Sequence, residues 1–210
     1  MKNSVILTLA ALLLCSCSKD ETVIPNPSTY DGYMWVDNEK FPLEILHDTH
    51  FIVFKRNDEQ TVLQQLKEKG CAIVNSTYMM FTSHLYEYHP ESLKDCLCTN
   101  VKGVGNLREI PQLVYNTHLY RAPQTIHPYK ERGASNGFYV GVNSEEDLDM
   151  VEEYARRVNA FVIRESYKLR GVLVVCTNAS AGTHVQLANW FYETGKFRYA
   201  EPEMQDINWY

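Results

Sequence analysis

The sequence lacks long apolar runs after its first residues, and it lacks an excess of positive charge. No stretch beyond Cys17 approaches the ~18 consecutive apolar residues that a transmembrane helix needs. Twenty Lys and Arg against 26 Asp and Glu leave a formal net charge of -6. Because a phosphate-binding surface needs a basic stripe, this balance argues against nucleic-acid binding. Only ten Gly and eight Pro argue against a fibrous repeat, and an apolar fraction of 45% argues against a disordered chain.

Cysteines are too few and too unevenly spaced for a disulfide framework or a zinc knuckle. Cys96 and Cys98 are separated by a single residue, and no second pair has metal-binding spacing. Cys71 and Cys176 fall in strand-like apolar runs, where a free thiol packs as a small hydrophobic group. We therefore expect buried free thiols, although an oxidising compartment also allows two disulfides.

Motifs that carry catalysis are also missing. The sequence has no Gly-x-Ser-x-Gly elbow, and Ser180 near His184 lies at the start of a predicted helix, where serine is most often a cap. Four histidines are either metal ligands or ordinary surface-loop residues: His47, His50, His84 and His89. The second interpretation fits their spacing better, so we expect no catalytic residue, no bound metal and no cofactor.

The N-terminal residues have the pattern of a bacterial export signal. Lys2 precedes an almost wholly apolar run over 5–14, which is too short to span a bilayer. The run ends in Leu-Cys-Ser-Cys, which resembles the lipobox of bacterial lipoproteins. This resemblance implies that residues 1–16 are removed and that Cys17 is lipidated. An ordinary secretory signal with incidental cysteines is the alternative.

The residues that follow predict the destination. The segment Ser-Lys-Asp-Glu at 18–21 resembles the export tag of Bacteroidetes lipoproteins, which implies a lipid anchor in the outer membrane and exposure at the cell surface. Several acyl chains on Cys17 make such an anchor effectively permanent. Residues 17–32, with two prolines among small polar residues, are then predicted to be a tether.

Residues 33–120 are predicted to form a first α+β repeat that begins with an aromatic hairpin. After the hairpin, the apolar pattern predicts a strand, a helix, two strands, a short helix over 91–97 and a last strand over 107–115. Asp58 and Gly70 are the expected start and stop signals of the first helix.

Residues 137–204 are predicted to repeat that order, after a linker over 121–136. Ser144 is the expected cap of one helix, and a second helix is expected over 179–194. The offsets between matching segments are 87 residues (51 to 138) and 90 residues (105 to 195), which favours a duplication.

The order β-α-β-β-α-β within about ninety residues is typical of the ferredoxin-like fold. We therefore expect an α+β protein with tandem ferredoxin-like units, antiparallel sheets and helices on one face. One α+β domain with irregular insertions is the alternative. Residues 205–210 are predicted to form a tail.

The segment 187–203, LANWFYETGKFRYAEPE, carries a family resemblance. It resembles the end of the pro-segment of subtilisin-like serine proteases, especially the large secreted Bacteroidetes members, whose motif ends in Asp where this chain has Glu203. The resemblance implies that Glu201 and Glu203 are positioning acids at helix N-termini of a protease. It also implies that Gln205 to Tyr210 fill the protease cleft as an added strand, with Trp209 or Tyr210 in the primary specificity pocket.

The catalytic Asp, His and Ser blocks of such proteases are absent, so the chain is predicted not to be an enzyme. We interpret it as a surface-anchored pro-segment without its protease, which binds a subtilisin-like protease in trans as an inhibitor or folding chaperone. One alternative is an orphan or split front of a protease zymogen. A second is an adhesion or glycan-binding module that uses exposed aromatic residues such as Tyr33 and Trp35.

Overall fold

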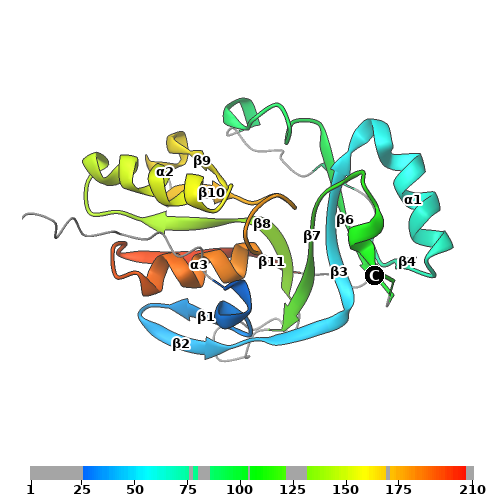
Figure 1. Ribbon diagram of the computed structural model, residues 1–210, viewed down its shortest axis with the longest axis horizontal. Coiled ribbons are helices and arrows are strands. Elements are labelled where there is room, and N and C mark those ends of the chain that lie inside the picture. Colours follow the sequence, from blue (N-terminus) through cyan, green and yellow to red (C-terminus); the bar gives the residue numbers. More distant parts are fainter. Residues whose placement is uncertain are drawn as a thin grey trace, which may run out of the picture.

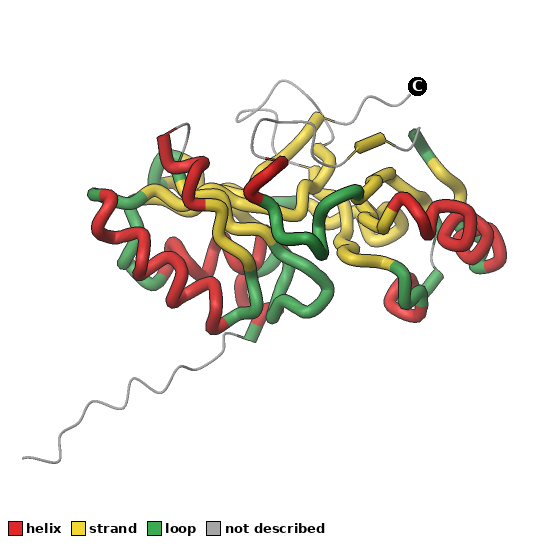
Figure 2. Tube along the Cα trace, turned by 90° about the horizontal axis from the view of Figure 1, so that it is seen from above, coloured by secondary structure: helices red, strands yellow, loops and turns green. Residues whose placement is uncertain are grey.

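The computed structural model describes residues 26–75, 78–79, 86–103, 105–121, 132–168 and 171–206. These residues form an α+β protein whose paired strands are all antiparallel, as the sequence predicts. Figure 1 and Figure 2 both place the first helix at one end of the molecule and the other two helices at the opposite end. Within the described residues, no helix has the length and apolar character required to cross a membrane. Cys17 and its neighbours lie outside this part of the chain.

The expected aromatic hairpin is present. Strands β1 (Tyr33–Val36) and β2 (Glu39–Pro42) pair in a two-stranded sheet of their own. The connecting residues Asp37 and Asn38 have φ values of 49° and 65°. Two consecutive positive φ angles define a type I′ turn, which matches the twist of a two-residue hairpin. A short 3₁₀ helix, η1 (Pro27–Tyr30), precedes the hairpin.

The first strand set surrounds one long strand. Its elements are β3 (Glu44–Lys55), α1 (Glu59–Glu68), β4 (Ala72–Ile73), β5 (Tyr78–Met79), β6 (Cys96–Lys102) and β7 (Leu113–Arg121). The strand order is β4-β6-β3-β7, and β5 also pairs with β6. Helix α1 buries Val62 and Leu66 against Ile52 and Phe54 of β3. Gly70, with φ 73°, ends this helical segment as the sequence predicts.

The prediction of a short helix over 91–97 is wrong. Residues 91–95 form a turn, and β6 begins at Cys96. Cys96 and Cys98 point into one core cluster while Leu97 points into another, so this strand is buried on both faces. A strand with two apolar faces shows no alternation, which removes the signal that distinguishes it from a helix. The strand expected over 107–115 also begins later, because Leu107–Glu109 forms a 3₁₀ turn, η4.

The second strand set is more regular. Its elements are β8 (Arg132–Gly141), α2 (Leu148–Arg157), β9 (Phe161–Ile163), β10 (Val172–Val175), α3 (His184–Glu193) and β11 (Tyr199–Asp206). The strand order is β11-β8-β10-β9. Ser144 forms the expected capping box with Asp147. Helix α3 begins later than expected because Thr183 and Gln186 form its own capping box.

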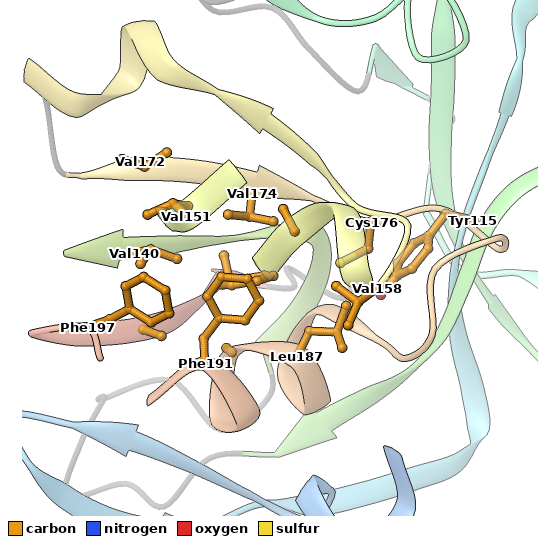
Figure 3. Packing of buried hydrophobic residues seen from close by; sticks show 14 of the residues in the cluster. Tyr115, Val140, Val151, Val158, Val172, Val174, Cys176, Leu187, Phe191 and Phe197 are labelled. Carbon is orange, nitrogen blue, oxygen red and sulfur yellow. The ribbon is translucent and has the colours of Figure 1, made fainter. Parts of the chain in front are cut away.

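One core connects the two sets. Strand β7 pairs with β8 at Tyr120 and Arg132, which places both sets in one sheet. The largest apolar cluster takes Phe51 and Tyr115 from the first set and Phe138 and Phe191 from the second. Figure 3 shows Tyr115 and Phe191 within this cluster. The four cysteines of the described chain are free and buried, as expected: Cys71, Cys96, Cys98 and Cys176.

Candidate functional site

The two acids of the pro-segment-like motif lie on the last strand. Glu201 and Glu203 belong to β11, whose intervening residue Pro202 is buried and faces the other way. Gln205 continues the pairing of β11 with β8 opposite Gly133, so it is part of the strand rather than of the expected tail. Trp209 and Tyr210 lie outside the described residues.

A row of paired residues crosses the sheet from Glu201. Glu201 pairs with Tyr139, Tyr139 with Leu173, and Leu173 with Ile163. Because paired residues of an antiparallel sheet share a face, all four side chains lie on the same side. Ala200, the residue before Glu201, pairs with Val140, and both are packed in the core that the helices cover. Glu201 and, two residues along the strand, Glu203 therefore face away from α2 and α3.

A bulge in β8 positions Glu203. Pro202 pairs with Phe138 and Met204 pairs with Ala134, so residues 135–137 of β8 lie opposite Glu203 alone. Within this bulge, Ser135 donates a hydrogen bond from its hydroxyl to a Glu203 carboxylate oxygen at 2.7 Å. The carboxylate is thus fixed to the sheet rather than free to turn into solvent.

The rest of this sheet face is covered by the chain itself. Ile163, Leu173 and Val175 are buried in one apolar cluster with Leu93, which comes from the turn before β6. A partner therefore cannot pack flat across the centre of this face. Strand β11, at the end of the row, is where the acidic side chains are accessible. No pattern in the sequence connected Leu93 to this face.

Two adjoining cavities lie between the strand sets. One has a volume of about 630 Å³ and is bordered by η1 and the loop before α3. The other has a volume of about 480 Å³ and is bordered by three histidines, His47, His50 and His118. Arg108, the second residue of the 3₁₀ turn η4, lines both cavities.

The three imidazoles form a compact cluster. The ring centroid of His118 is 4.6 Å from that of His50 and 5.4 Å from that of His47. Burial and the neighbouring His118 lower the pKa of His50 to about 4. Burial and His47 lower the pKa of His118 below its usual value. Within the residues that the structure places, no three His, Cys, Asp or Glu side chains are arranged to hold a metal ion.

Ser180 and His184 have separate structural roles. The Ser180 hydroxyl donates to the carbonyl of Asn159 at 2.8 Å. His184 is fully buried, and its Nδ1 is 3.1 Å from the hydroxyl oxygen of Tyr115. The cap of α3 is Thr183, so the sequence assignment of a cap at Ser180 is wrong by three residues.

The aromatic residues of the hairpin are engaged with α3. Glu193 accepts hydrogen bonds from the Tyr33 hydroxyl at 2.8 Å and from the Trp35 indole N–H at 3.1 Å. Trp35 also stacks on Tyr192, with ring centroids 4.7 Å apart. These contacts hold the hairpin on α3.

The geometry thus offers two places for recognition, the acidic edge along β11 and the histidine-lined cavity. No family model matches the sequence, and no curated protein or solved structure matches the chain. Its function is therefore inferred from these residues and from the resemblance carried by residues 187–203.

Proposed function

We propose that this chain is a binding protein that acts in trans on a subtilisin-like serine protease, as an inhibitor or folding chaperone. The observation that carries the proposal is the position of β11. This strand presents Glu201 and Glu203 away from the helices, and its pairing with β8 extends to Asp206. Residues 207–210 follow this strand in the sequence.

The proposed fold is a tandem of two ferredoxin-like units. Its support is the strand order, in which the last strand lies beside the first, the first beside the third and the third beside the second. The order β11-β8-β10-β9 fits this description, and so does β7-β3-β6-β4. The first unit departs from the pattern because only the 3₁₀ turn η4 lies between its third and fourth strands.

The proposed contact combines a carboxylate-bearing edge with an extended peptide. Carboxylates bind well at helix N-termini, where backbone N–H groups are unpaired. Glu203, fixed by Ser135, would supply such a carboxylate without losing side-chain entropy on binding. The last residues would add to the substrate-binding strands of the protease, with Trp209 or Tyr210 in the primary pocket.

The proposed location follows from the N-terminal residues. Lipid on Cys17 would hold the protein at the outer membrane, and residues 18–25 would separate the folded part from the lipid surface. The predicted tether over 17–32 is wrong at its end, because η1 (Pro27–Tyr30) and Asp31 are held on α3. The acyl chains on Cys17 would then provide the membrane contact. This arrangement requires neither a catalytic residue nor a cofactor.

Removal of residues 207–210 is expected to raise the inhibition constant of the mature chain at least ~100-fold, because a few anchor residues dominate most interfaces. The deletion leaves every pairing of β11 in place. The measurement is a titration of subtilisin-like proteases from the same organism with the mature chain, with circular dichroism as the fold control.

A matched pair of charge variants tests the edge. Glu203→Gln is expected to weaken inhibition, whereas Glu146→Gln, on an exposed position before α2, leaves it unchanged. Equal inhibition by the full-length and shortened chains would contradict the tail mechanism. Absence of both inhibition and co-purification across the protease panel would overturn the proposed function.

A further inference from the structure

The cavity of about 480 Å³ is lined by an exposed arginine, Arg108, that has no ion-pair partner among the described residues. Within the described part of the chain, the guanidinium of Arg108 makes no hydrogen bond or ion pair; the only hydrogen bond found for this residue is made by its backbone N–H, which donates to Asn106. A guanidinium is never deprotonated in a protein, so this charge is permanent. Its strongest partners would be the oxygen atoms of an anion.

The one carboxylate that lines this cavity is already committed. One oxygen of Asp31 accepts from the Gly32 N–H at 2.9 Å and lies 3.4 Å from the hydroxyl oxygen of Tyr120. The other accepts from the side-chain amide of Gln186 at 2.9 Å. Asp31 therefore anchors the N-terminal segment to β7 and α3, and Arg108 is left without a carboxylate.

The histidines supply further donors beside Arg108. A bulge in β3 brings His47 and His50 together. Leu46 pairs with Leu119 while His50 pairs with His118, which places residues 47–49 outside the regular pairing with β7. Nδ1 of His118 is buried and has no hydrogen-bond partner among the described residues. The N-terminus of α3, at Thr183, borders the same cavity and adds positive potential.

We propose that this cavity is a binding site for a small oxyanion, the carboxylate or phosphate group of a ligand, held by Arg108 and the imidazoles of His47, His50 and His118. The adjoining cavity of about 630 Å³ leaves room for the uncharged remainder of such a ligand. The site shares no residue with the β11 edge, so it is independent of the proposed protease contact.

Binding of an anion at this site couples to proton uptake. The groups facing His50 are His118 and Asp48, and the Asp48 carboxylate is paired with Lys102 at 3.5 Å. The groups facing His118 are His47, Asp31 and Arg108. An anion beside His50 and His118 offsets the repulsion between their protonated rings and favours their protonated forms. The affinity therefore increases as the pH falls.

The test is a sulfate titration of the mature chain, followed by NMR of the histidine ring signals. Sulfate keeps its charge between pH 5 and pH 8, so any pH dependence belongs to the protein. We expect saturable shifts of three histidine ring signals and an affinity about tenfold higher at pH 5.5 than at pH 7.5. Parallel titrations with acetate and inorganic phosphate distinguish a carboxylate site from a phosphate site.

Arg108→Gln is expected to weaken sulfate binding about tenfold or more, whereas Arg198→Gln, an exposed arginine beside Tyr199, leaves it unchanged. Unchanged binding by Arg108→Gln overturns the proposal, as does the absence of sulfate-induced histidine shifts. Perturbation of the three rings by Zn²⁺ but not by sulfate also overturns it. The chain lacking residues 207–210 is expected to keep its sulfate affinity, which separates this site from the protease contact.

Discussion

Replacement of Phe191 by alanine is expected to lower the free energy of unfolding by about 3–5 kcal/mol. Phe191 is 0% exposed and lies on the buried face of α3. Its ring centroid is 5.0 Å from that of Phe138, 5.1 Å from that of Phe197 and 5.9 Å from that of Tyr154. The alanine variant therefore leaves a cavity among rings from β8, α2 and the segment before β11 (Figure 3).

The neighbouring residue provides the control. Tyr192 is half-buried, packs against the edge of the cluster that contains Phe191, and lies against Trp35 of the hairpin. Tyr192→Ala is expected to cost less than about 2 kcal/mol. Urea unfolding measures the free energy of unfolding of both variants. The melting temperature of the Phe191 variant should also be about 6–20 °C lower than that of the wild type. Equal costs for the two variants would contradict the assignment of Phe191 to the central core.

Acidification is expected to destabilise the protein through His184. Burial lowers the pKa of this imidazole to about 3, whereas a histidine in an unfolded chain has a pKa of ~6.5. The unfolded state therefore takes up a proton first as the pH falls. The contribution to stability is complete above pH ~6.5 and decreases by about 1.4 kcal/mol per pH unit from there toward pH ~3.

The location of His184 explains why it stays neutral. Its Nδ1 is paired with the Tyr115 hydroxyl, and its ring lies at the first residue of α3, where the helix dipole opposes a positive charge. At pH 5 the loss from this group amounts to about 2 kcal/mol. The pKa of His50 is also lowered, to about 4, so this residue likewise makes the free energy of unfolding decrease as the pH falls.

Two variants separate this effect from general acid unfolding. His184→Asn should show a weaker loss of unfolding free energy between pH 7.5 and pH 5, measured with urea. Arg198→Gln, at an exposed position whose side chain stays charged over this range, should retain the wild-type slope. NMR titration of the wild-type chain gives a direct check, in which the His184 ring signals stay constant down to pH 4. A midpoint near pH 6.5 would contradict the prediction.

Elements with local signals were predictable from the sequence. The hairpin turn at Asp37 and Asn38 and the capping box at Ser144 depend on a few adjacent residues, and both are present. The strand beginning at Cys96 was missed, because its side chains enter two different cores. The start of α3 was misplaced because Ser180 and Thr183 are both suitable caps by residue type.

The two candidate sites also differ in whether the sequence could predict them. The shared face of Glu201 and Glu203 follows from the period of two in a strand, so it could be predicted. The histidine cavity could not, because it depends on the pairing of β3 with β7 and on the bulge after Leu46. In a regular strand His47 and His50 would point to opposite faces.

The attachment of the N-terminal segment to α3 has a mechanical consequence. The side-chain amide of Asn189 donates to the carbonyls of Tyr30 at 2.8 Å and Tyr33 at 2.7 Å. Met34 of the hairpin and Met204 of β11 belong to one apolar cluster, so the first and last described segments meet beside α3. If the proposed lipid anchor and the proposed partner at β11 pull on the protein, the tension would pass through this patch, and the large core between the strand sets would carry little of the load.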